Sequence, residues 1–188
     1  MALPKWLLLL SANIHVSKYP MWIQYKPSLH KTTGADIQKF ISTVKVGDLV
    51  FRRHDGYLNT YFTPGFWGHV GIVVSPSEVI HAIEKGVVKE LLLDFCRTDH
   101  MCVARFKKAN SENIQYAVST ANTLLGLDYD YEFETTNSAY YCTELIDFCY
   151  KNVFAPYYTK QAIGSQKVLL PSDIADCGLL DILLDIRK

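Results

Sequence analysis

The sequence predicts an α+β fold with a central antiparallel sheet flanked by helices. Runs rich in β-branched residues cluster between residues 47 and 106, whereas segments with helical spacing of apolar residues lie on both sides of that cluster. The chain has 188 residues, of which 49% are hydrophobic and 20% charged. This size and composition are typical of one globular domain with a substantial core.

The strands are expected to follow a short helix over residues 33–41, where Ile37, Phe40 and Ile41 fall at helical spacing. The strand-like runs cover residues 47–52, 69–74, 79–83, 86–93 and 101–106. Ser75-Pro76-Ser77 separates the second and third runs as a turn, so these two strands are expected to form a hairpin.

Helices are expected to dominate the second half of the chain. Asn110 caps a helix that Gly126 closes, and Cys142 begins a second helix that extends to about residue 153. Pro171 begins a further helical turn. Residues 179–186 are predicted to form a terminal helix.

Composition excludes several classes of function. Nineteen basic and nineteen acidic residues give a net charge of zero, which argues against a nucleic-acid partner because phosphate neutralisation supplies most of that affinity. The five cysteines include no CxxC pair, so neither a disulfide framework nor a structural zinc site is expected. We expect no metal and no cofactor.

Three residues could form a thiol-based catalytic site. Cys142 stands where a polar loop becomes a helix, and backbone N–H groups at a helix start lower the pKa of a thiol and bind an oxyanion. His69 begins an apolar strand and could act as the general base. A third group would orient that base. A two-residue turn places Glu84 opposite His69, whereas a longer loop or a bulge brings His81 onto the same face, so both stay candidates.

The surrounding strings resemble a known superfamily. Gly47-Asp48-Leu49-Val50-Phe51, His69-Val70-Gly71-Ile72 and Val79-Ile80-His81-Ala82 are similar to the NlpC-type papain-like thiol hydrolases. Because no cysteine precedes Cys96, the usual order of cysteine before histidine is impossible. Tyr140-Tyr141-Cys142-Thr143-Glu144-Leu145 instead resembles the circularly permuted branch, which includes YaeF/YiiX-like bacterial proteins, poxvirus relatives and the lecithin:retinol acyltransferase group. The flanking strings 126–130 and 170–175 are also similar to that branch.

The resemblance implies a permuted papain-like fold and a cysteine hydrolase that cleaves an amide, in a peptide or N-acyl compound, through a Cys-His-His site and a thioester intermediate. Cys142 would be the nucleophile, His69 the base and His81 its orienting partner. An acyltransferase, or a lipid- or small-ligand-binding protein on the same fold, is the alternative.

Further residues are candidates for binding the substrate. The aromatic side chains Tyr140, Tyr141 and Trp67 could line the site. The carboxylates of Asp128 and Asp130, which precede the nucleophile in an acidic run, could recognise an amine; Glu84 completes the set. The expected partner is a small-molecule, peptide or acyl-lipid substrate.

Residues 1–44 are expected to form an N-terminal segment packed on or next to a catalytic domain of residues 45–188. Lys5 and the run Leu7–Leu10 resemble a weak signal peptide, but about five apolar residues are fewer than the roughly 7–15 of an h-region. We therefore expect a cytoplasmic protein, and an export or membrane-surface role for this segment stays open. The sequence does not predict an oligomeric state.

Overall fold

The computed structural model describes residues 14–16, 23–25, 30–57, 60, 63–133, 138–158 and 167–188. For 14–16 and 23–25 the description is limited to the backbone. The apolar start of the chain, the aromatic residues Tyr61 and Phe62 and the carboxylate of Glu134 lie outside the described residues.

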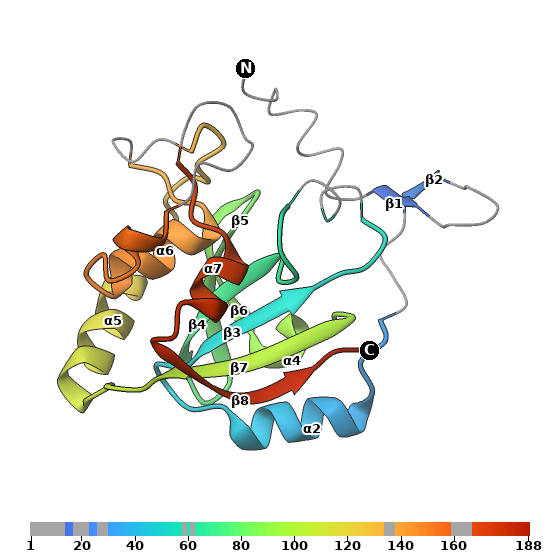
Figure 1. Ribbon diagram of the computed structural model, residues 1–188, viewed down its shortest axis with the longest axis horizontal. Helices are drawn as coiled ribbons and strands as arrows, with labels where there is room; N and C mark the ends of the chain where they lie inside the picture. The colour runs from blue at the N-terminus through green and yellow to red at the C-terminus, as the bar shows by residue number, and fades with distance from the viewer. Residues whose placement is uncertain are drawn as a thin grey trace.

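A six-stranded antiparallel sheet forms the centre of the fold (Figure 1). Its strands, in spatial order, are β6 (Gly86–Leu91), β5 (Glu78–Ile83), β4 (His69–Ser75), β3 (Leu49–Arg53), β7 (His100–Phe106) and β8 (Leu180–Ile186). Two short strands, β1 (Ile14–Val16) and β2 (Ile23–Tyr25), pair with each other. The predicted α+β class with a central antiparallel sheet is confirmed.

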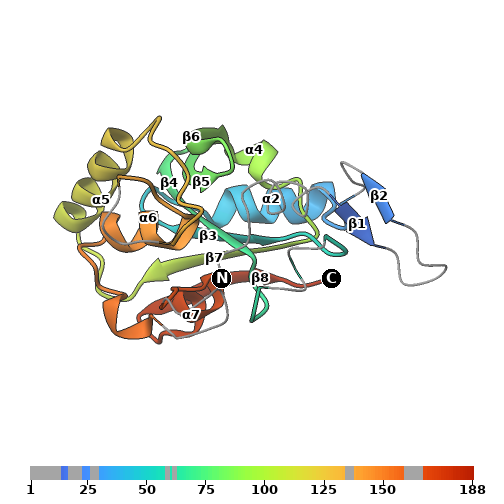
Figure 2. The same ribbon diagram turned by 90° about the horizontal axis from the view of Figure 1, so that it is seen from above.

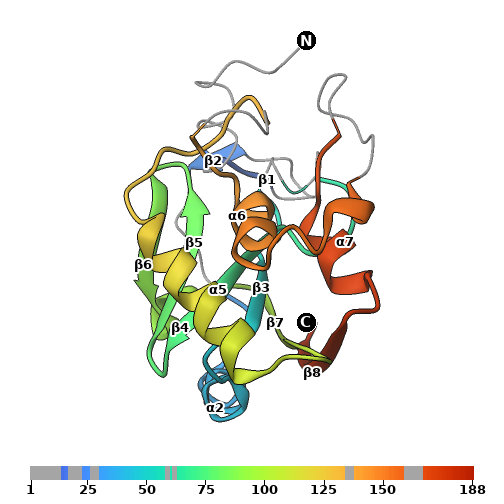
Figure 3. The same cartoon turned by 90° about the vertical axis from the view of Figure 1, so that its left-hand side faces the viewer.

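Helices pack on both faces of the sheet and create two cores (Figures 2 and 3). One face is covered by α5 (Ser111–Thr123), α6 (Cys142–Cys149) and α7 (Pro171–Asp176), and the other by α2 (Gly34–Thr43) and α4 (Leu92–Phe95). A short 3-10 helix, η1 (Ala155–Tyr157), follows α6. Because side chains alternate along each strand, Val70 and Ile72 enter the first core, whereas Val73 and Val79 enter the second.

Local sequence explains where the two longest helices begin. Thr33 and Asp36 form a reciprocal capping box at the start of α2, and Phe40 in that helix is fully buried. Asn110 caps α5 by accepting a hydrogen bond from the N–H of Asn113. In α5, Ala121 belongs to the buried face.

The terminal helix expected over residues 179–186 is wrong, because Leu180–Ile186 form strand β8. The Leu and Ile spacing there is compatible with a helix, but β7 has a free edge whose backbone groups need partners. β8 supplies them along the length of β7, with Met101 opposite Ile186. The strand expected over 86–93 also ends early, since Leu92–Phe95 turn into α4.

The hairpin between β4 and β5 contains a bulge that fixes the site. Ser75 pairs with Glu78 across the turn, but Val73 pairs with Val79, so Val74 is an extra residue on β4. The shift by one residue brings His81, rather than Glu84, onto the face of the hairpin that carries His69. No helix in the described part of the chain is long and apolar enough to cross a bilayer.

Candidate active site

Cys142 is the first residue of α6, at the helix end where backbone N–H groups lack helical partners. The preceding Tyr141 provides no side-chain cap, so these groups remain available. Thr143 anchors this end of the helix, since its hydroxyl donates a 2.6 Å hydrogen bond to the carbonyl of Leu169. The local fold therefore holds a thiol against a set of backbone donors.

Burial raises the pKa of the Cys142 thiol to about 11. The backbone N–H groups of Val70, Thr143 and Cys142 itself face the sulfur and act in the opposite direction, as does the charge of Arg52. The expectation of a lowered pKa is wrong, because the side chain is only 8% exposed and desolvation outweighs the helix start. Cys142 is therefore a neutral thiol at neutral pH and needs a base to become a nucleophile.

His69 and His81 lie next to each other on the hairpin. Nε2 of His69 is 2.7 Å from Nδ1 of His81, and the two rings meet edge to face. Gly71 makes room for this pair, because a Cβ at that position would lie 3.2 Å from Cβ of His81 and 2.6 Å from Cγ2 of Val79. Burial, followed by the charge of Arg52, lowers the pKa of the His69 imidazole, and burial also lowers that of His81, so both are neutral at neutral pH.

Glu90 and Arg52, which were not predicted from the sequence, extend the chain of polar contacts that begins at His69 and His81. Oε2 of Glu90 lies 3.1 Å from Nε2 of His81 and 3.2 Å from NH1 of Arg52. The guanidinium of Arg52 also stacks on the ring of Phe95. Glu84 is exposed, and its carbonyl accepts a hydrogen bond from the hydroxyl of Tyr131. Glu90, not Glu84, is thus the carboxylate next to the histidine pair.

The polar contacts of the two rings indicate which nitrogen of each ring carries the proton. A carboxylate only accepts, so the proton of neutral His81 belongs on Nε2, facing Glu90. Nδ1 of His81 then accepts from Nε2 of His69. This leaves Nδ1 of His69 without a proton, in the form that a general base requires.

The Cys142 thiol and the His69 ring both lie near the start of β4, on opposite faces of the sheet. Cys142 faces the N–H of Val70, the residue that follows His69. Because side chains alternate, the His69 ring lies on the opposite face, with His81 and Phe95. No hydrogen bond joins the sulfur to the ring in the structure, which describes both residues. Catalytic hydrogen bonds often tighten only with bound substrate.

The predicted aromatic lining is largely buried. Trp67 is 2% exposed and packs between Phe51 and Phe66 in the core. Tyr141 is 3% exposed, and its hydroxyl accepts a hydrogen bond from the N–H of Leu169. Tyr140 is half-buried. Of these aromatics, Tyr140 has the most surface available for a substrate.

The family-like strings around the site have structural roles. Ser172, in the 170–175 string, accepts a hydrogen bond from the N–H of Trp67, which fixes the loop before His69. Asp128, in the 126–130 string, is exposed, and its carbonyl accepts from the N–H of Tyr140. Both contacts hold segments that flank the thiol and the imidazole.

The two predicted amine-binding carboxylates differ in environment. Asp130 is 1% exposed and accepts hydrogen bonds from the N–H groups of Glu132 and Phe133. Burial and then the charge of Asp130 raise the pKa of Glu144 to about 7. Of Asp128 and Asp130, Asp128 is the exposed residue and the one whose carboxylate could contact an amine of a substrate. Across the described residues, no group of three or more His, Cys, Asp or Glu side chains is arranged to hold a metal ion.

The six-stranded sheet, the helix that begins with a cysteine and the preceding histidine hairpin define a permuted papain-like protein. The chain belongs to the family of permuted papain-like amidases of the YaeF/YiiX type (C92 family), whose model matches residues 43–178. The resemblance stated from the sequence is thereby confirmed, and the chain is related to cysteine hydrolases at the level of the family.

Individual relatives are distant. The chain is 24% identical over 134 residues to Protein OPG091 of vaccinia virus strain Copenhagen, covering 69% of this chain and 78% of the viral protein. The variola virus protein of the same name matches equally. The crystal structure of YiiX from Escherichia coli O157:H7, described as a metalloprotein, superposes with a TM-score of 0.64 at 19% identity, over 78% of this chain and 99% of YiiX. That likeness supports the fold.

Proposed function

We propose that the protein hydrolyses an amide bond in a peptide or N-acyl substrate, with Cys142 as nucleophile, His69 as general base and His81 as the group that orients the base. Membership of an amidase family supports the reaction class. The observation that carries the residue assignment is the position of the Cys142 thiol at the start of α6, against the peptide that follows His69, whose ring is held by His81 at 2.7 Å.

The reaction begins from neutral groups. As the sulfur of Cys142 attacks the carbonyl carbon, its proton passes to Nδ1 of His69. The carbonyl electrons move to the oxygen, where backbone N–H groups at the start of α6 stabilise the negative charge. The tetrahedral intermediate collapses with cleavage of the C–N bond, and His69 returns the proton to the leaving amine. A thioester remains on Cys142.

Hydrolysis of the thioester completes the cycle. Water attacks the acyl carbon and gives a proton to His69, the C–S bond breaks, and the thiolate recovers a proton. A carboxylic acid leaves the site. Glu90 contacts His81, and Arg52 contacts Glu90, so we assign both as positioning residues that favour the tautomer in which Nδ1 of His69 carries no proton.

Alkylation with iodoacetamide tests the assignment without a known substrate. The protein carries its own references: burial raises the pKa of the Cys96 and Cys102 thiols to about 12, and Cys177 is more exposed than Cys142. At neutral pH, Cys142 is expected to react faster than all three. His69→Gln should slow Cys142 alone by on the order of 100-fold, in line with the contribution of a general base.

Peptide mapping by mass spectrometry measures each site separately. If Cys142 reacts no faster than Cys177 in the native protein, or if His69→Gln leaves its rate unchanged, the proposed dyad is wrong. Hydrolysis of a panel of N-acyl amides then identifies the substrate, and Cys142→Ala is the inactive control.

A further inference from the structure

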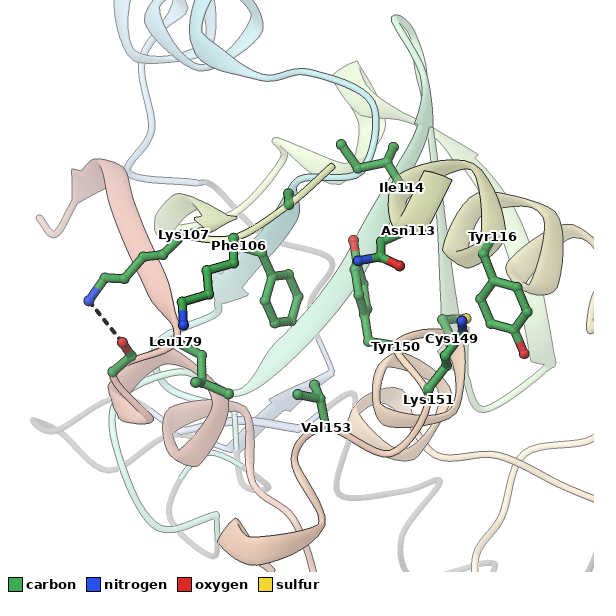
Figure 4. Close-up of a pocket in the computed structure, with 13 residues that line it drawn as sticks. Phe106, Lys107, Asn113, Ile114, Tyr116, Cys149, Tyr150, Lys151, Val153 and Leu179 are labelled. Atoms are coloured by element: carbon green, nitrogen blue, oxygen red, sulfur yellow. Dashed lines mark hydrogen bonds between the residues drawn. The ribbon is translucent and has the colours of Figure 1, made fainter. Parts of the chain in front are cut away.

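A cavity lies away from the candidate active site. It has a volume of about 380 Å³ and lies between α5, the carboxyl end of α6 and the beginning of β8 (Figure 4). Cys149, at the last turn of α6, lines it, whereas Cys142 is at the first turn. At about 1.5 Å per residue, these two ends of the helix are roughly 10 Å apart. None of Cys142, His69 or His81 lines the cavity.

The floor of this cavity is apolar. Its side chains include Phe106, Ile114, Cys149, Tyr150, Val153 and Leu179. The one hydroxyl among these six is directed elsewhere, since Tyr150 donates a 2.6 Å hydrogen bond to the carbonyl of Gly47. Burial raises the pKa of the Cys149 thiol to about 12, so this sulfur is neutral. The floor therefore offers hydrocarbon and aromatic surface without a charge.

The lining carries charge of one sign only. Lys107, Lys108 and Lys151 contribute to it, and no Asp or Glu is among the thirteen lining residues. Lys107 donates to the carbonyl of Gly178, Lys151 lies over the ring of Tyr116, and Lys108 is exposed. In a protein of zero net charge, this is a local basic site. Apolar walls focus such a field on a ligand of opposite sign.

We propose that this cavity binds a single-chain anionic amphiphile, with its hydrocarbon chain on the apolar floor and its carboxylate or phosphate head group at the lysines. A volume of about 380 Å³ lies in the range of small-molecule sites, roughly 300–1,000 Å³. The combination of a neutral floor and three ammonium groups matches both parts of such a molecule. The site is separate from the proposed catalytic chemistry and does not depend on it.

Calorimetric titration of the full chain with straight-chain carboxylates tests the proposal. Octanoate, decanoate and dodecanoate, used below their critical micelle concentrations, should bind with an affinity that increases about fourfold for each added methylene while the chain still fits. Dodecyltrimethylammonium has the same tail and the opposite charge, and it should bind at least about 10-fold more weakly. Dodecyl phosphate and a dodecyl lysophospholipid, compared with dodecanoate, show which head group is preferred.

Two variants test whether the ligand binds in this cavity. Val153→Asp adds a carboxylate to a lining position that is 39% exposed, and Lys108→Glu reverses one lysine. Each should weaken dodecanoate by about 10-fold or more. Lys39→Glu, at an exposed position of α2 over the other face of the sheet, is the matched control and should leave dodecanoate binding unchanged. Cys142→Ala should also bind normally.

Four results would overturn the proposal. One is the lack of saturable binding up to roughly 1 mM dodecanoate. Another is equal affinity for the cationic amphiphile. The third is unchanged binding in both Val153→Asp and Lys108→Glu when circular dichroism shows that they are folded. Loss of binding in Cys142→Ala would move the ligand to the active site and would overturn it as well.

Discussion

Replacing Glu90 with Gln tests whether the carboxylate next to His81 controls the base. The substitution keeps the size of the side chain and removes its charge. The new amide could donate to Nε2 of His81 as well as accept from it, so the preference for one tautomer is lost. Arg52 would also lose its anionic partner, at 3.2 Å, and would disfavour a proton on His69 more strongly.

The size of the effect follows from the geometry. The imidazole of His81 separates Glu90 from His69, with contacts of 3.1 and 2.7 Å on its two sides. A carboxylate about 8 Å from the base, at an effective dielectric constant of about 20, stabilises the imidazolium by about 2 kcal/mol. The population of the thiolate–imidazolium pair should therefore fall about 30-fold in Glu90→Gln.

The rate of iodoacetamide alkylation of Cys142 between pH 6 and 11 measures that population. The rate in Glu90→Gln should be about 30-fold lower than in the native protein at pH 7. The two rates should converge near pH 11, because the thiol, with a pKa of about 11, then ionises without the base. Glu84→Gln is the matched control at an exposed carboxylate and should stay within about twofold.

An unchanged rate at pH 7 in a folded Glu90→Gln variant would refute the reasoning, because the carboxylate would then have no influence on the base. An equal loss in Glu84→Gln would refute it too. The effect would then be one of net charge on the surface rather than of the Glu90 contact.

Three further predictions concern stability. Gly71→Ala should lower the free energy of unfolding in urea by about 1–3 kcal/mol, because its Cβ would lie 2.6 Å from Val79, whereas Gly68→Ala meets no atom within 4 Å and should change it little. Glu144→Gln should raise the free energy of unfolding by up to about 3 kcal/mol at pH 8, because the pKa of this carboxyl is about 7 in the folded protein, above its ordinary 4.5, and the buried carboxylate is destabilising once ionised. This gain should decrease as the pH falls below 7 and vanish at about 4.5. An equal gain at pH 4 and pH 8 would contradict the prediction. Cys142→Ala should abolish alkylation at this position and shift the melting temperature by only a few degrees.

The sequence was sufficient to predict most of the sheet because its inner strands are continuous β-branched runs. Val70, Ile72 and Val73 show this on β4, where both faces are covered by helices. Strand β8 was missed because its formation depends on the free edge of β7, a partner so distant along the chain that no local pattern reveals it. Exposed Ile182 and Leu183 gave its sequence a helical appearance.

The candidate site was predictable where it depends on local strings and unpredictable where it depends on packing. Cys142 was selected from its position before an apolar helical run, but the burial that raises its pKa arises from packing against β4. Glu90 was missed even though a signal exists. A two-residue turn at Glu84-Lys85 pairs Val79 with Glu90 and puts this carboxylate on the same face as His81.

The bulge at Val74 determines which residue of β5 lies next to His69. If Val74 paired with Val79 instead of bulging, the register of the Ser75–Glu78 pair would continue along β4 and would place Glu84 opposite His69. A carboxylate in direct contact raises the pKa of an imidazole and favours the ion pair of thiolate and imidazolium at rest. With the bulge, the contact is neutral His81 at 2.7 Å, and His69 stays unprotonated. Deleting Val74 should leave the contact between His69 and His81, and the alkylation rate of Cys142, unchanged, because Val73 would still pair with Val79 next to the Ser75–Glu78 pair.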